Sequence, residues 1–123
     1  MTSPKGRILC TEDHADTREL IVYFLNRAGF ETVCAGTAAE ALSLVLTEDF
    51  DLYVIDNWLP EISGIDLCKR IRAHDTRTPI LFYSGASFES DKQRAFEAGA
   101  QAYLVKPVAD DMLVQEATRL ISQ

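Results

Sequence analysis

Five residues with chemically useful side chains each follow a short apolar run in this sequence: Glu12, Asp13, Asp56, Ser84 and Lys106. Asp56 poses the sharpest question, because the run Leu52–Ile55 before it is typical of a buried strand and burial of an unpaired charge is costly. Two carboxylates about 4 Å apart repel by about 4 kcal/mol at an effective dielectric constant of 20. If the acids meet, we therefore expect a cation among them.

The residue types favour Mg²⁺ and phosphoryl transfer. Mg²⁺ keeps several waters and takes one or two carboxylates together with phosphate oxygens. Beside it, Asp56 can act as a nucleophile and form an acyl phosphate, while Lys106 and Ser84 hold the remaining phosphoryl oxygens. No cluster of histidines and cysteines competes for zinc, and we expect His14, next to the acids, to be solvated. Taken singly, each acid has an ordinary explanation as a turn residue or helix cap.

These five residues lie close together in space only if the segments before them are strands of one parallel sheet. Apolar or β-branched runs alternate with segments of helical spacing, which predicts a parallel sheet covered by helices on both faces. In such sheets, ligands bind outside the carboxyl ends of the strands. The expected strands are Ile8–Cys10, Thr32–Ala35, Leu52–Ile55, Ile80–Tyr83 and Tyr103–Val105.

Helical stripes lie between these runs. One begins near Thr37, where Glu40 three residues later predicts a capping box, and another ends before Gly29, a natural residue after a helix. The segment 88–98 is the weakest helix, because its "ESDKQR" portion is entirely polar.

Bulk composition restricts the function. With 123 residues, 47% hydrophobic and 25% charged, we expect one domain over residues 1–123 with no effector domain visible. The net charge of −7 argues against nucleic-acid binding by this domain. The sequence has no export signal and no apolar run long enough to span a membrane, and three cysteines without a CxxC spacing are typical of reduced thiols in a cytoplasmic protein.

Together, the stretches "RILCTEDHADTREL", "YVIDNWLPEISGIDLCKRIRA", "TPILFYSGAS" and "AGAQAYLVKPV" resemble the receiver domain of two-component response regulators, of the chemotaxis-regulator type. Each motif alone is weak, but the set covers nearly the whole chain in family order. The resemblance implies an α/β fold, a doubly wound, flavodoxin-like sheet of five parallel strands in the order 2-1-3-4-5 with five helices. It also implies a phosphoacceptor signalling switch rather than an enzyme.

For the metal site, the resemblance implies that Asp13 and Asp56 ligate Mg²⁺ directly and that Glu12 acts through water. Trp58 would offer its backbone carbonyl to the metal and its N–H to the phosphoryl group. A histidine kinase or a histidine phosphotransfer protein would donate the phosphoryl group to Asp56.

For the response, the resemblance implies that Lys106 pairs with the acyl phosphate beside a cis peptide to Pro107, and that Ser84 and Tyr103 form the switch pair. A hydrogen bond to a charged group is worth about 1.5–3 kcal/mol. If Ser84 forms that bond only after phosphorylation, Tyr103 can turn and change the surface near helix 88–98, where a downstream protein would bind.

Trp58 and Gly85 depart from the common pattern; alanine often stands where Gly85 does and gives a less flexible backbone. Trp58 has three readings: an exposed cover on the loop, a shield that keeps water from the acyl phosphate and slows autodephosphorylation, or a partner contact. Ala86, two residues after Ser84, offers no polar group to orient that water.

Other classes fit less well. A phosphohydrolase of the haloacid-dehalogenase type needs D-x-D after the first strand, and "TEDHAD" does not supply it. Flavin or dinucleotide binding lacks its G-x-G-x-x-G loop. The remaining alternative is a degenerate receiver that serves as a phosphorylation-independent interaction scaffold, against which the complete set of Asp13, Asp56, Ser84 and Lys106 argues.

Overall fold

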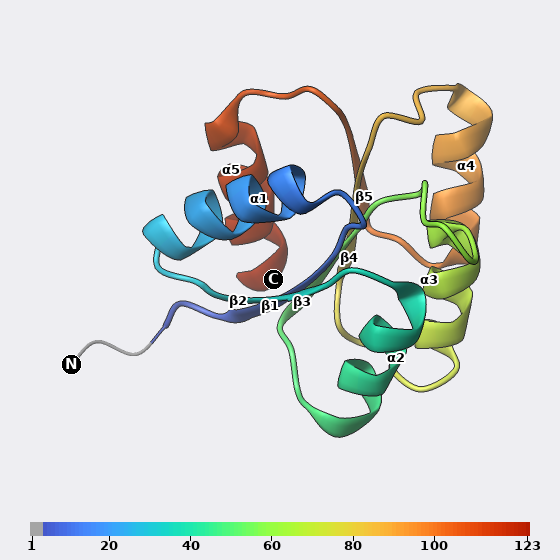
Figure 1. Cartoon of the computed structure of the whole chain (residues 1–123), viewed down its shortest axis with the longest axis horizontal. Helices are drawn as coiled ribbons and strands as arrows, with labels where there is room; N and C mark the ends of the chain where they lie inside the picture. The colour runs from blue at the N-terminus through green and yellow to red at the C-terminus, as the bar shows by residue number, and fades with distance from the viewer. Residues whose placement is uncertain (1–3) are drawn as a thin grey trace.

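A computed structural model describes residues 4–123, except for the side chain of Asp110. Five strands and five helices alternate along the chain, as the sequence pattern predicts (Figure 1). The strands are β1 (Arg7–Thr11), β2 (Glu31–Ala35), β3 (Leu52–Ile55), β4 (Ile80–Ser84) and β5 (Ala102–Val105). The helices are α1 (Ala15–Arg27), α2 (Ala38–Thr47), α3 (Gly64–Arg72), α4 (Glu89–Ala98) and α5 (Asp110–Ile121).

The sheet is parallel throughout and has the strand order β2-β1-β3-β4-β5. The chain therefore reverses its direction of winding between β1 and β3, which makes the carboxyl ends of these two strands the switch point at which doubly wound sheets bind ligands. The expected fold class and strand order are both confirmed.

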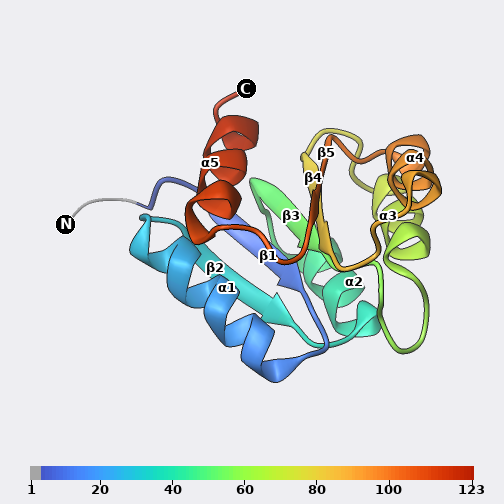
Figure 2. The same cartoon turned by 90° about the horizontal axis from the view of Figure 1, so that it is seen from above.

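The helices cover both faces of the sheet. Figure 2 shows α1 and α5 on one side and α2, α3 and α4 on the other. Each side has its own hydrophobic cluster, with Ile8, Leu25 and Leu113 on the α1–α5 side and Leu9, Ile71 and Phe82 on the opposite side. Because β3 is central, all four of its residues are buried, and its end is held rigidly.

Two helix ends carried a sequence signal, and both lie where that signal predicts. The Thr37 side chain caps α2 by accepting from the Glu40 N–H at 3.2 Å. The expected capping box is displaced by one residue, because Glu40 accepts from the N–H of Gly36 at 3.3 Å. Gly29 has φ +104°, the left-handed conformation that favours glycine after a helix.

The weak helix signal at 88–98 corresponds to α4. Asp91 supports its first turn by accepting from the Phe88 N–H at 3.1 Å, and Gly99 closes it in the left-handed region. Only two of its residues, Ala95 and Ala98, are buried, which explains why its apolar stripe is faint in the sequence.

None of the helices in the described part of the chain, residues 4–123, has the length and apolar character that a membrane crossing requires.

Candidate functional site

Three carboxylates meet at the carboxyl ends of β1 and β3. The strands pair with Thr11 opposite Ile55, so the residues that follow them, Glu12 and Asp56, leave the sheet side by side. The Asp56 N–H continues the ladder by donating to the Thr11 carbonyl at 3.1 Å. One oxygen each from Glu12, Asp13 and Asp56 lies within 4.8 Å of the others.

The three acids differ in exposure. Glu12 and Asp56 are buried, with exposed fractions of 2% and 6%, whereas Asp13 is exposed. Burial raises the pKa of Glu12, and the charge of Asp56 raises it further, although its hydrogen bond with Lys106 acts in the opposite direction. The cluster therefore holds negative charge that costs free energy without a cation.

Lys106 supplies part of that countercharge. Its ammonium forms ion pairs with Glu12 and with Asp56, the latter with Nζ 3.3 Å from Oδ2. Burial works against the charge of Lys106, but these two acids raise its pKa above the usual value, so the ammonium stays protonated. The cluster contains three carboxylates and one ammonium, so it keeps a net negative charge.

The position of Lys106 is fixed by the sheet. Its backbone N–H donates to the Ser84 carbonyl at 2.9 Å, which extends the β4–β5 ladder by one residue. The peptide bond to Pro107 is cis, as expected.

Hard oxygen ligands of this kind fit Mg²⁺. The carboxylates converge from one edge of the sheet, with one member open to solvent, and this leaves room for the waters that Mg²⁺ retains. The described residues at this site contribute no thiolate to the cluster, which argues for a hard cation over zinc.

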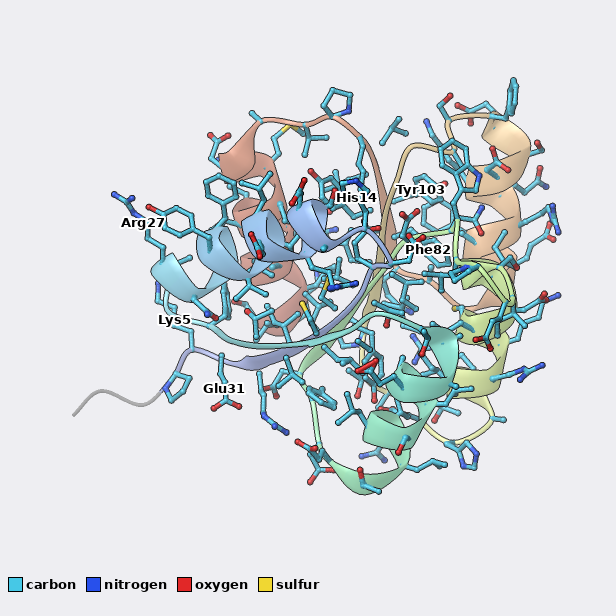
Figure 3. The ribbon with its side chains drawn as sticks, viewed as in Figure 1. Lys5, His14, Arg27, Glu31, Phe82 and Tyr103 are labelled. Carbon is cyan, nitrogen blue, oxygen red and sulfur yellow. The ribbon has the colours of Figure 1, made fainter. Side chains whose placement is uncertain are left out.

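Ser84 and Tyr103 lie on neighbouring strands near the acids. Ser84 is fully buried, and its Oγ accepts from the Ala86 N–H at 3.2 Å. The Tyr103 hydroxyl donates to the Ala86 carbonyl at 2.6 Å, and its ring stacks on Phe82 with the centroids 5.5 Å apart. Figure 3 shows these two rings together. Both residues of the predicted switch pair thus contact the same residue of the β4–α4 loop, Ala86, in this conformation.

Trp58 lies over that loop. Its backbone N–H donates to Asp56 Oδ1 at 3.1 Å, while the side chain is 63% exposed. A Cβ placed on Gly85 would lie 2.8 Å from Cζ3 of the indole, so the ring rests against the glycine. Glycine at residue 85 therefore leaves space for the Trp58 ring, in addition to the backbone flexibility expected from the sequence.

Three residues contribute more than the sequence indicated. Asn57 is buried and accepts from the N–H groups of Gly64 and Ile65, with its carbonyl and its side-chain oxygen respectively. A Cβ on Gly64 would lie 2.3 Å from the Asp56 carbonyl oxygen, so only glycine fits there. Ser63 caps α3 by accepting from the Asp66 N–H at 3.1 Å.

His14 is exposed, as expected, and it also has a structural role. Its Nδ1 accepts from the Thr17 N–H at 3.4 Å and caps α1, while its own backbone N–H donates to Glu12 Oε2 at 3.2 Å. Figure 3 shows His14 at the start of α1, at the end of the helix opposite to Arg27. A histidine is an uncommon helix cap, and the sequence alone carried no signal for it.

The comparisons with known proteins agree with this geometry. The family model for the response regulator receiver domain matches residues 8–118. This chain belongs to that family, whose members are phosphorylation-based signalling switches. It is 35% identical to a probable transcriptional regulatory protein of Picosynechococcus sp. over 97% of this chain and 50% of the relative.

Solved structures show the same fold. A putative response regulator from Chloroflexus aurantiacus has a TM-score of 0.91 at 33% identity, covering 98% of this chain and 100% of that one. The chemotaxis response regulator CheY4 of Vibrio cholerae has a TM-score of 0.88 at 27% identity, covering 97% and 99% respectively.

The expected chemotaxis type is not shown. The curated relatives bear the names of transcriptional regulators, and the chain spans about half the length of those it matches. What the comparisons establish is the receiver family itself.

Proposed function

We propose that this chain accepts a phosphoryl group on Asp56, with Mg²⁺ held by Asp13 and Asp56 directly and by Glu12 through water. The observation that carries the proposal is the convergence of three carboxylates with the Lys106 ammonium at the switch point of the sheet. The Trp58 carbonyl completes the proposed metal ligands. When bound, Mg²⁺ would neutralise phosphoryl oxygens and so lower the barrier to attack by an anionic nucleophile.

The chain's own residues position the reaction. Asp56 ends a fully buried strand and attacks phosphorus with a carboxylate oxygen, so that an O–P bond forms while the bond to the donor breaks. Trp58 holds the other carboxylate oxygen through its backbone N–H and keeps Asp56 oriented. Lys106, now paired with Asp56, would shift to the phosphoryl oxygens and balance their charge.

The donor that we propose is a phosphohistidine on a histidine kinase or histidine phosphotransfer protein. Its phosphoryl group reaches Asp56 from the loop edge of the sheet, where Asp13 is exposed. Such ATP-dependent kinases act in the cytoplasm, and we propose that location for this chain.

The response would use Ser84 and Tyr103. The Ser84 hydroxyl, whose Oγ accepts from the Ala86 N–H, would donate its proton to a phosphoryl oxygen, and the Ala86 carbonyl is the acceptor of Tyr103. Movement of the β4–α4 loop would therefore weaken or strengthen the hydrogen bond of the Tyr103 hydroxyl, because Ser84 and Tyr103 both contact Ala86. A hydrogen bond of about 1.5–3 kcal/mol shifts a two-state equilibrium roughly tenfold to a hundredfold.

The output that we propose is a protein contact near α4 and Tyr103, with no nucleic acid bound by this domain. Phe88 and Phe96 are exposed there, at 76% and 47%, and large exposed aromatic side chains favour interfaces.

The first experiment is intact-mass spectrometry after incubation with Mg²⁺ and acetyl phosphate. We expect one phosphoryl increment that disappears when EDTA removes the metal and is absent in Asp56→Asn, whose side chain is similar in shape but is not a nucleophile. The increment should also form with a phosphorylated histidine phosphotransfer domain. If Mg²⁺ binds and neither donor yields an increment, the proposal fails and the interaction scaffold becomes the better account.

A further inference from the structure

Two cysteines lie next to each other beneath α1, on neighbouring strands. Cys10 of β1 and Cys34 of β2 are direct partners in the parallel register. Both pack into the hydrophobic cluster on the α1–α5 side of the sheet, so their side chains share one face. Both are free thiols. Neighbouring strands lie about 4.8 Å apart, within the Cα separation of about 4.4–6.8 Å that a disulfide spans.

The two thiols have different surroundings. Cys10 is fully buried, whereas Cys34 is half-buried and lines a surface cavity of about 720 Å³ together with Arg18 and Tyr23 of α1. Helix α1 extends across this face from His14 to Arg27 (Figure 3). Small solutes can therefore reach Cys34 from solvent. Cys10 lies behind Cys34 and is shielded from them.

The reactivity of the two thiols is expected to differ in the same sense as their exposure. The hydrogen bond with Cys10 lowers the pKa of the Cys34 thiol, and the charge of Arg18 lowers it further, against the effect of burial. Cys10, by contrast, is completely buried and has no access to solvent. Thiolate character and access together select the cysteine that reacts first.

Cys68 provides an internal comparison. It lies in the hydrophobic cluster on the opposite face of the sheet and donates to the Ala98 carbonyl at 3.5 Å. Burial raises its pKa to about 11, which keeps it a thiol at neutral pH.

We propose that Cys34 and Cys10 form a redox-reactive dithiol that hydroperoxides convert into a disulfide between β1 and β2. In the first step the Cys34 thiolate attacks the peroxide, so that an S–O bond forms, the O–O bond breaks and the departing oxygen takes a proton from water. Sulfur is oxidised to the sulfenic acid and the peroxide is reduced. In the second step Cys10 attacks that sulfur, the S–S bond forms, and the hydroxyl leaves with the Cys10 proton as water.

This dithiol is separate from the acidic site in its chemistry, and the proposal stands or falls independently of phosphoryl transfer. The two are nevertheless close in the fold. Cys10 precedes Glu12 by two residues, and Arg18 donates to the carbonyls of Glu12 and Asp13 at 2.9 and 3.0 Å.

The test treats the reduced, folded protein with hydrogen peroxide, removes the oxidant, unfolds the chain and counts maleimide adducts by intact mass. Of the three cysteines in the chain, we expect two to be lost to alkylation, leaving Cys68, with full recovery after dithiothreitol. Peptide mapping should find the Cys10–Cys34 cross-link. Three adducts after peroxide treatment, or a cross-link that involves Cys68, would overturn the proposal.

Single variants separate the two roles. Cys34→Ser should keep both remaining thiols, because the nucleophile is gone. Cys10→Ser should stop at a sulfenic acid on Cys34, which dimedone traps. Cys68→Ser should form the cross-link as the native chain does, and its circular dichroism spectrum shows whether the exchange leaves the fold intact. Equal oxidation of the native and Cys34→Ser chains would contradict the assignment of Cys34 as the reactive thiol.

Discussion

Lys106 shows how single residues balance the charge of this site. Its ammonium contacts two acids that are nearly inaccessible to solvent, Glu12 and Asp56. Without it, repulsion between pairs of these acids would reach several kcal/mol. In the proposed reaction the ammonium would follow the negative charge from Asp56 onto the phosphoryl group, because the two acids are its hydrogen-bond partners here.

Trp58 and Gly85 are in close contact, and the shielding hypothesis predicts that this contact prolongs the lifetime of the proposed acyl phosphate. We expect Trp58→Asn to accelerate autodephosphorylation about tenfold, which corresponds to about 1.4 kcal/mol of barrier, because water then gains access beside Asp56. The measurement is the decay of the phosphorylated mass after the donor is removed.

Gly85→Ala is the matched variant. A Cβ at that residue would lie 2.8 Å from the indole, so the ring must move while it stays in the protein. Trp58 is the only tryptophan, so a shift of its fluorescence confirms the displacement, and the decay rate should then fall between those of the native chain and Trp58→Asn. An unchanged lifetime in both variants would rule out shielding, and slower transfer from a kinase would then favour the partner contact.

On the scale of the elements, a hydrogen bond from Gly64 joins the two ends of the β3–α3 loop. Its N–H donates to the Asn57 carbonyl at 2.9 Å, and its Cα lies so near the Asp56 carbonyl that no side chain fits. The start of α3 thereby fixes the backbone that carries Asp56, the proposed phosphoacceptor.

Gly64→Ala should destabilise the protein by about 1–3 kcal/mol, the usual range for overpacking, although alanine has the higher helix propensity by about 1 kcal/mol. The clash is with backbone atoms, which cannot move aside as a side chain can. Phosphorylation should slow as well, because relief of the clash displaces Asp56. Urea unfolding and the phosphorylation rate check both effects.

Gly6→Ala is the control for this variant, because its Cβ would meet only side-chain atoms, of Ile121 at 3.2 Å and of Asp51 at 3.5 Å. We expect a smaller loss of stability and an unchanged phosphorylation rate. Equal stability of Gly64→Ala and the native chain would show that the loop adapts and that the close approach does not hold Asp56 in place.

On the scale of the whole molecule, the proposed Mg²⁺ site would make stability depend on the metal. Folding gathers Glu12, Asp13 and Asp56, so only the folded chain should bind Mg²⁺ tightly. A ligand at one hundred times its Kd adds about 2.7 kcal/mol to the free energy of unfolding. We therefore expect Mg²⁺ to raise the Tm by roughly 5–15 °C for a domain of this size, and EDTA to reverse the rise.

Asp13→Asn is the control for metal binding. Asp13 is exposed, so the substitution should leave the metal-free Tm nearly unchanged while it removes most of the increase. An equal rise in both proteins would place the bound ion elsewhere on this acidic chain, whose net charge is −7.

The sequence by itself determined the fold class and the convergence of the acids and Lys106 at one edge of the sheet. The central strand Leu52–Ile55 was predicted to the residue, because a fully buried strand is a continuous apolar run with a clear end. The acids, Ser84 and Lys106 were found because parallel strands bring their carboxyl ends to one edge, so that residues far apart in the chain are placed by pattern alone.

Tertiary structure decided the contacts that no local pattern encodes. The indole against Gly85, the backbone against Gly64, and the pairing of Cys10 with Cys34 each join segments whose separation depends on register and loop path. The capping role of His14 likewise depends on how its ring meets the first turn of α1, which the sequence pattern did not indicate. Periodicity fixes which face of an element is buried, but only packing fixes which atoms of two loops or two neighbouring strands meet.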